Sequence, residues 1–226
     1  MRLIVITTET FFENEAEAIN LLFKNGLETL HLRKPFASQH ETLAFIRQIN
    51  KTYFSRIVLH DFHDLAVLFH LKGIHLNRRN QSIQMGFQPE INNLQEDKGM
   101  SMKKCVLTVS RSCHSLEEVN ASSDCDYVFL SPVFQSISKI GYGRGFSPEQ
   151  LNEAKEQKII NEQVIALGGI TADNIPATHR YGFGGVAVLG ALWGDFAAKK
   201  NVSALLNRFM KLKMVCEEHE CMKFVT

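Results

Sequence analysis

The chain has 226 residues, of which 45% are hydrophobic and 22% charged, as expected for one globular domain with a sizeable core. Its formal net charge of +1 excludes a general attraction to nucleic acid or to a membrane surface, so any anion site must be local. The five cysteines form no CxxC pair, so we expect free thiols. The opening MRLIVITTE is too short for a secretory signal, and no apolar run reaches about 18 residues. We therefore expect a cytoplasmic protein with no membrane span.

The first half of the chain alternates short apolar runs with helical patterns. Strands buried on both faces are predicted at Leu3–Thr7, Leu27–Leu32, Arg56–Leu59 and Gly73–Leu76. Asn14 is a candidate N-cap for the first helix, and Ser38 with Glu41 has the spacing of a capping box for the second. Residues 80–103 are polar and irregular, which predicts a loop, alone or with one poor helix.

The second half repeats this alternation. Further strands are predicted at Cys105–Val109, Asp126–Leu130, Val164–Leu167 and Gly184–Leu189. Helix starts are predicted at Ser115, at Ser147-Pro148, and at Thr171 or Asp173. A helix over Asn201–Met214 completes the pattern, and a polar, frayed tail is expected after Val215.

Eight strands alternating with helices indicate parallel βαβ units, and eight such units favour a closed (β/α)8 barrel over residues 1–215, with a tail at 216–226. A doubly wound open sheet is the alternative. No GxGxxG motif follows the first strand, which argues against a doubly wound nucleotide-binding sheet.

The last two predicted strands both end at glycine. Gly168 and Gly169 follow the seventh strand, and Leu189-Gly190 follows the eighth. Glycine lets the backbone N–H groups approach a ligand closely, and barrels commonly bind phosphate after these two strands. We therefore predict a phosphate site here.

Cationic side chains cluster near the carboxyl ends of the other strands, where barrels carry their chemistry. They are Arg33, Lys34, Arg78, Arg79, Arg111 and Lys139. Such a rim favours an anion with more than one phosphate. The alternatives are a solvated loop for Arg33 and Lys34 and plain surface for Arg78 and Arg79.

Histidines and one aspartate occupy the same ends. Asp61 pairs with an arginine or binds a metal ion, and His60 beside it holds a cation or moves a proton. His31 and His75 alternate with leucines, which fits side chains that face inward and are simply hydrogen-bonded. His114 is a candidate local cap.

At this point the chain resembles the thiamine phosphate synthase / thiazole tautomerase family of (β/α)8 barrels. The motifs that carry the resemblance are LHLRK at 30–34, HD at 60–61 with GIHL at 73–76, SRSCHSLEE at 110–118, DYVFLSPVF at 126–134 with SISK at 136–139, and ALGGITADN at 166–174. The resemblance covers about residues 1–195.

The resemblance implies an enzyme of thiamine biosynthesis that joins hydroxymethylpyrimidine pyrophosphate to thiazole phosphate and releases pyrophosphate. It implies pyrophosphate contacts from Arg33, Ser112 and Lys139, and Mg²⁺ held by Asp61 and Asn80. The substrate-binding residues it implies are His31, Lys34, His60, Ser136, Ser138, Gly168, Gly169, Leu189 and Gly190. A homodimer is a further expectation.

Several positions depart from the synthase pattern. Pro35 stands where the family has lysine, His60 replaces asparagine, and Asn80 replaces the second metal-binding aspartate, which should weaken Mg²⁺ binding. SRSCHSLEE is closer to the tautomerase branch, although Pro132 stands where that branch has a functional histidine. A thiazole tautomerase using His114 or His60, and a non-catalytic binder of thiazole or thiamine phosphate, are therefore the alternatives.

Overall fold

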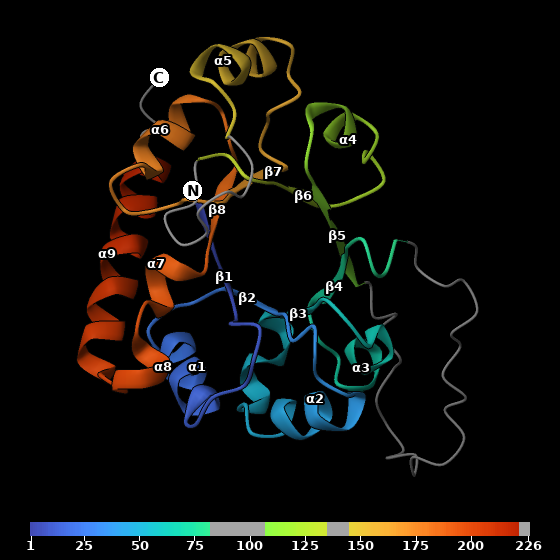
Figure 1. The fold of residues 1–226 in the computed structure, drawn as a ribbon, viewed down its shortest axis with the longest axis vertical. Helices are drawn as coiled ribbons and strands as arrows, with labels where there is room; N and C mark the ends of the chain where they lie inside the picture. The colour runs from blue at the N-terminus through green and yellow to red at the C-terminus, as the bar shows by residue number, and fades with distance from the viewer. Residues whose placement is uncertain (82–106, 135–144, 222–226) are drawn as a thin grey trace.

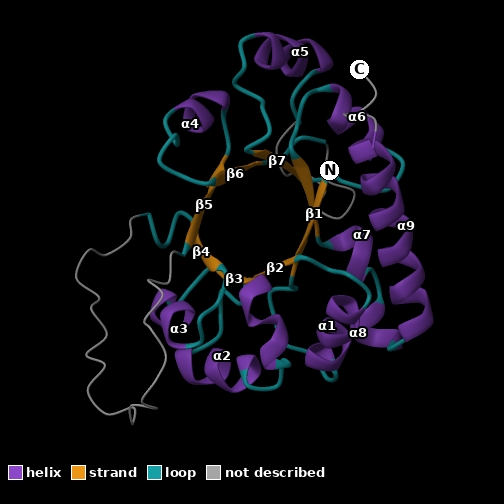
Figure 2. Ribbon diagram, turned by 180° about the vertical axis from the view of Figure 1, so that it is seen from behind, coloured by secondary structure: helices purple, strands orange, loops and turns teal. Residues whose placement is uncertain are grey.

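The computed structural model describes residues 1–81, 107–134 and 145–221, and these form a closed barrel of parallel strands inside a ring of helices (Figures 1 and 2). The strands are β1 (Arg2–Ile6), β2 (Thr29–Leu32), β3 (Ile57–Leu59), β4 (Gly73–Leu76), β5 (Thr108–Cys113), β6 (Tyr127–Leu130), β7 (Val164–Leu167) and β8 (Gly185–Val188). Each strand pairs with the next, and β1 pairs with β8 through the register Leu3↔Val186. This closure confirms the predicted (β/α)8 barrel and excludes the doubly wound alternative.

The helices lie outside the strands (Figure 2). They are α1 (Glu15–Lys24), α2 (Gln39–Ile46), α3 (His63–Leu68), α4 (Leu116–Asn120), α5 (Pro148–Glu156), α6 (Ile175–Arg180), α7 (Gly190–Trp193), α8 (Phe196–Lys199) and α9 (Val202–Cys221), with a 3-10 turn at Lys51–Arg56. None of the described helices is long and apolar enough to cross a membrane.

Seven of the eight strands lie within one or two residues of their predicted bounds, but β5 begins three residues later than predicted and continues to Cys113. Its sequence, TVSRSC, lacks the apolar run of a buried strand because Ser110 and Ser112 contact an imidazole ring rather than hydrocarbon. Ser112 is therefore a strand residue and not part of the loop after the strand.

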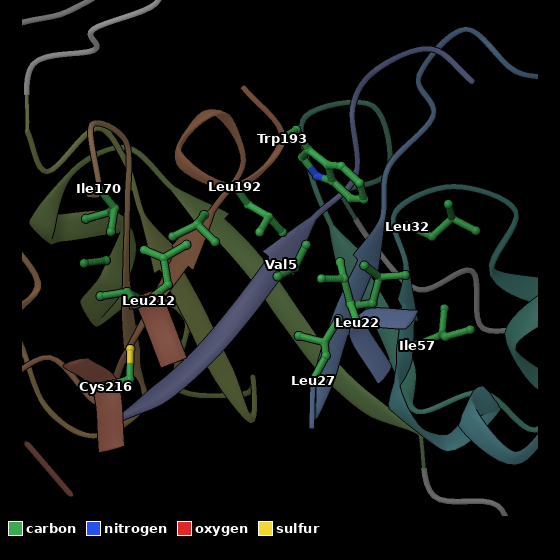
Figure 3. Close-up of a cluster of buried hydrophobic side chains, with 14 of the residues drawn as sticks. Val5, Leu22, Leu27, Leu32, Ile57, Ile170, Leu192, Trp193, Leu212 and Cys216 are labelled. Atoms are coloured by element: carbon green, nitrogen blue, oxygen red, sulfur yellow. The ribbon is translucent and has the colours of Figure 1, made fainter. Parts of the chain in front are cut away.

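Two apolar layers hold the barrel together. Between strands and helices, Val5, Leu22, Leu27, Leu192 and Trp193 belong to one continuous buried cluster (Figure 3). A smaller cluster fills one side of the barrel interior, and it consists of Ile4, Ile6, Tyr127, Phe129, Ile165 and Ala187. The other side of the interior, lined by β2 to β5, is polar.

The helix starts agree with the sequence where a serine caps the helix. Ser38 with Glu41, and Ser147 with Gln150, form capping boxes, and Ser115 accepts from the Glu118 N–H. Asn14 stands at the N-cap position of α1, as predicted, but it adopts a left-handed conformation and its side chain makes no cap hydrogen bond.

At α6 the N-cap is Asn174, and neither Thr171 nor Asp173 caps the helix. The Asn174 side chain instead accepts from the Thr171 N–H at 2.9 Å and donates to the Gly169 carbonyl at 2.8 Å. At the other end of the chain, α9 runs past the expected boundary at residue 215. Cys216 is buried and its carbonyl accepts from the Met1 amino group at 2.8 Å, which ties the helix to the start of β1.

Candidate functional site

The polar side of the barrel interior holds three buried imidazoles. His31 on β2, His60 after β3 and His75 on β4 are 0%, 4% and 0% exposed. His31 Nδ1 lies 3.0 Å from His60 Nε2, and His31 Nε2 lies 2.7 Å from the Tyr127 hydroxyl. The His60 and His75 rings stack with their centroids 4.1 Å apart. Burial lowers the pKa of all three histidines, that of His75 to about 3, so the cluster is neutral at pH 7.

This burial confirms the interpretation of His31 and His75 as inward-facing, hydrogen-bonded residues. Both ring nitrogens of His31 are engaged by other side chains, and the His60 ring stacks on that of His75. The substrate-binding roles predicted for His31 and His60 therefore gain no support from these contacts and remain predictions.

The three histidines are close enough to suggest a metal centre, since one nitrogen of each lies within 4.8 Å of the others. A metal ion lies in the plane of every imidazole that binds it. The His60 and His75 rings are stacked, with only 27° between their planes. A single ion at bonding distance from both rings therefore cannot lie in the plane of both. Internal hydrogen bonds, rather than an ion, satisfy this cluster.

Ser112 connects the buried histidines to open space. Its hydroxyl oxygen lies 2.8 Å from His75 Nε2, and the residue is half-buried. Ser112 also lines a cavity of about 440 Å³ together with Asn77, Arg78, Arg111 and His114, at the carboxyl ends of β4 and β5. A smaller cavity of about 140 Å³ lies at the amino ends of β6 and β7, and its lining shares Ser122 with that of the larger cavity.

Asp61, the predicted metal ligand, is bound by cationic and amide donors. Arg79 Nη2 donates to both Asp61 oxygens at 3.0 Å. Asn80 Nδ2 donates to Asp61 Oδ1 and to the His60 carbonyl, both at 3.1 Å. Because its nitrogen faces two acceptors, the amide oxygen of Asn80 is turned away from Asp61. In this arrangement the two residues do not fit a magnesium ion held between them.

Lys34 does not belong to the cationic rim in which the sequence placed it. Its ammonium group is buried and donates to both Glu15 oxygens at 2.7 Å and to the Thr10 carbonyl at 2.9 Å. All three ammonium protons are used, so Lys34 has none left for a phosphate. Burial raises the pKa of Glu15 and lowers that of Lys34, and their mutual attraction opposes both shifts.

The remaining members of the rim are only partly available. Arg33 is partly exposed and pairs with Glu9 at 2.9 Å, while Arg78 is exposed at the edge of the large cavity. Arg111 lies 3.8 Å from Asp124, which draws it toward the loop before β6. Ser136, Ser138 and Lys139 lie outside the described residues, so their predicted roles remain predictions.

The glycine turns after β7 and β8 are neighbours because these strands are paired. Gly168 has a φ of +95°, and a Cβ there would lie 2.8 Å from the Cα of Pro132. A Cβ on Gly190 would meet no atom within 4 Å, so the space beside this residue is open. Both turns stand where the sequence predicted a phosphate site, and Leu189 immediately precedes α7.

His114 acts locally. Its ring Nδ1 lies 3.0 Å from the Ser131 carbonyl, and its backbone N–H donates to the Glu118 carboxylate at 2.6 Å. Sequence reasoning assigned no role to Tyr127 or Ser110. The Tyr127 ring belongs to the apolar cluster, but its hydroxyl contacts His31 across the interior, and Ser110 contacts His75. The available signal was the two-residue spacing between Tyr127 and Phe129 and between Ser110 and Ser112, because residues two apart in a strand point to the same face.

A family model and several relatives identify the family to which the chain belongs. The family model described as thiamine monophosphate synthase matches residues 3–192. A solved thiamine phosphate pyrophosphorylase from Bacteroides thetaiotaomicron is 40% identical, with a TM-score of 0.80, and the match covers 96% of this chain and 98% of that one.

Two further relatives are more distant. Thiamine-phosphate synthase of Limosilactobacillus fermentum is 28% identical over 177 residues, 76% of each chain. A thiamine phosphate pyrophosphorylase from Pyrococcus furiosus shares the fold, with a TM-score of 0.64 at 23% identity over 93% of this chain and 96% of that one.

Proposed function

The chain belongs to the thiamine monophosphate synthase family, and on that premise we propose that it joins hydroxymethylpyrimidine pyrophosphate to thiazole phosphate with release of pyrophosphate. The family match over residues 3–192, in a chain 40% identical to a thiamine phosphate pyrophosphorylase, is the observation that carries this proposal. The reaction is a transfer in which a pyrophosphate leaves and the thiazole nitrogen bonds to the pyrimidine methylene carbon.

Two regions of the rim support the binding of phosphorylated substrates. The open space beside Gly190 leaves room for a phosphate next to the backbone, and we assign the thiazole phosphate to this turn and to the neighbouring turn at Gly168 and Gly169. Arg33 and Arg78 lie at the ends of β2 and β4, where they would draw the pyrophosphate to the barrel and stabilise its charge as it leaves.

Arg79 gives the Asp61 region a different character from a metal centre. Its guanidinium supplies a fixed positive charge to the carboxylate that the resemblance assigns to Mg²⁺. We propose that Arg79, and not a resident divalent ion, neutralises Asp61 between turnovers. A requirement for Mg²⁺ remains a prediction, and an assay of pyrophosphate release with and without the ion tests it.

The direct test measures pyrophosphate release with both substrates present, and each substrate alone serves as the control. Release that requires both substrates, together with formation of thiamine phosphate, supports the synthase. Proton exchange on the thiazole phosphate without release would instead indicate the tautomerase. Tight binding of thiazole phosphate with neither reaction would indicate a binding protein.

The proposal also covers the cellular compartment and the oligomeric state. Cys113 and Cys125 are buried, free thiols, which supports a reducing compartment such as the cytoplasm. We also propose a homodimer, which analytical ultracentrifugation at micromolar concentration would test.

A further inference from the structure

The buried ammonium group of Lys34 joins three parts of the structure. It donates to both carboxylate oxygens of Glu15, the first residue of α1, at 2.7 Å, and to the Thr10 carbonyl in the connection between β1 and α1 at 2.9 Å. It also lies 4.7 Å from the centroid of the Phe11 ring and 5.6 Å from that of Phe45 on α2. The β1–α1 connection and α2 are therefore both held against the carboxyl end of β2.

The same connection holds Arg33, the residue before Lys34. The Thr7 hydroxyl accepts from the Arg33 N–H at 2.9 Å and donates to the Arg33 carbonyl at 3.1 Å, which fixes the backbone. The Glu9 carboxylate accepts from Arg33 Nη1 at 2.9 Å, which orients the guanidinium. Glu9 precedes Thr10 in the chain, so the carboxylate that holds Arg33 lies next to the carbonyl that Lys34 holds.

The charge of Arg33 reaches the polar interior of the barrel. Burial is the main cause of the low pKa of His60, and the positive charge of Arg33 contributes to it. An arginine has five N–H groups, and the bond to Glu9 engages Nη1, so the guanidinium can bind an anion while Glu9 holds it. A guanidinium that is already held in place binds such an anion with less loss of side-chain freedom.

We propose that Lys34 is a positioning residue, which holds the β1–α1 connection against the end of β2 so that Glu9 keeps the Arg33 guanidinium in place for an incoming pyrophosphate. Lys34 itself does not touch the substrate, because its three protons are bound inside the protein. The role rests on the proposed function only for the identity of the anion that Arg33 binds.

Stability alone does not explain a buried ion pair such as Lys34 and Glu15. Removing two charges from water offsets much of their attraction, and an apolar pair of similar volume is often equally stable. The ion pair adds direction, because its protons point to two carboxylate oxygens and one carbonyl, whereas an apolar side chain would pack against Phe11 and Phe45 without holding the Thr10 carbonyl. A variant that removes both charges therefore separates positioning from stability.

The order of the Arg33 side chain is the direct readout, and it needs no ligand. In protein labelled with ¹⁵N-arginine, the ¹⁵N–¹H heteronuclear NOE of Arg33 Nε reports fast motion of the guanidinium, and an Arg33→Lys variant assigns the signal. We expect an ordered guanidinium in wild type and a mobile one in the double variant Lys34→Met with Glu15→Gln. A mobile guanidinium in wild type, or an equally ordered one in the double variant, would overturn the proposal.

Calorimetry with inorganic pyrophosphate measures the consequence in the site. The double variant loses one positive and one negative charge, so its net charge, and with it the general attraction for an anion, is unchanged. We expect its affinity for pyrophosphate to fall about tenfold, the usual effect of one hydrogen bond to a charged group. The control Lys51→Met, at an exposed lysine before β3, should stay within about twofold of wild type.

A double-mutant cycle shows whether the effect passes through Arg33. Removal of the ion pair should cost little further affinity once Arg33→Ala is present. A wild-type affinity in the variant without the pair, or a full tenfold loss in the Arg33→Ala background, would refute the proposal.

A milder variant covers the case in which the protein without the ion pair does not fold. Glu9→Ala removes only the carboxylate that holds the guanidinium, at a half-buried position, and should also mobilise Arg33. An ordered Arg33 in this variant would contradict the proposal. If wild type binds no pyrophosphate, the proposed function fails, whereas the NMR measurement still decides the role of Lys34.

Discussion

The buried histidines predict a loss of stability in mild acid, and His75 gives its size. An unfolded chain binds a proton to this ring near pH 6.5, whereas burial lowers the pKa of folded His75 to about 3. Below pH 6.5 the unfolded state therefore binds more protons than the folded state. The stabilisation is complete above pH 6.5 and is lost progressively as the pH falls toward 3.

The magnitude follows from the two pKa values. At pH 5 the unfolded state gains about 2 kcal/mol from protonation of this one ring, and by pH 3 more than twice that. His31 and His60 have pKa values lowered for the same reason, and they act in the same direction. A loss of this size is a large part of the 5–15 kcal/mol that stabilises a typical domain.

The assay is urea unfolding followed by far-ultraviolet circular dichroism at pH 7.5 and pH 5.0. His75→Asn is expected to be less stable at pH 7.5, because it loses the bond to Ser112, but to lose about 2 kcal/mol less than wild type on acidification. His40→Asn, at an exposed position, should follow the wild-type pH dependence. Equal losses in His75→Asn and wild type would refute the reasoning.

Four further single substitutions test other parts of the structure. Lys34→Met leaves the Glu15 carboxylate buried without its partner and should lower the free energy of unfolding by about 3–5 kcal/mol, while adding Glu15→Gln should restore part of it; thermal and urea unfolding measure both. Asn80→Asp adds a carboxylate and should strengthen Mn²⁺ binding in electron paramagnetic resonance titrations, whereas unchanged binding would show that no metal centre forms there. Gly168→Ala should destabilise the fold by about 1–3 kcal/mol because its φ is positive and Pro132 is close. A Cβ at position 190 would meet no atom, so Gly190→Ala should leave the free energy of unfolding unchanged. It should weaken thiazole phosphate binding in calorimetry, and an unaltered affinity would place the phosphate elsewhere.

The sequence by itself was enough to predict the barrel. Apolar runs, serine caps and glycine ends are local patterns, and the apolar run recurs once for each of the eight strands whatever the distant contacts are. The same local alternation placed His31 and His75 inside the barrel. It failed at β5, whose serines face imidazoles and therefore carry no apolar signal.

Only the tertiary structure decided what the polar residues do. Lys34 is bound by Glu15, nineteen residues away, and His31 by Tyr127, ninety-six residues away. Asp61 is bound by Arg79, and the sequence alone fitted a plain surface position for this arginine equally well. A charge or a hydroxyl takes its role from the group within about 3 Å of it. That group is set by barrel closure, and no local pattern in the sequence specifies it.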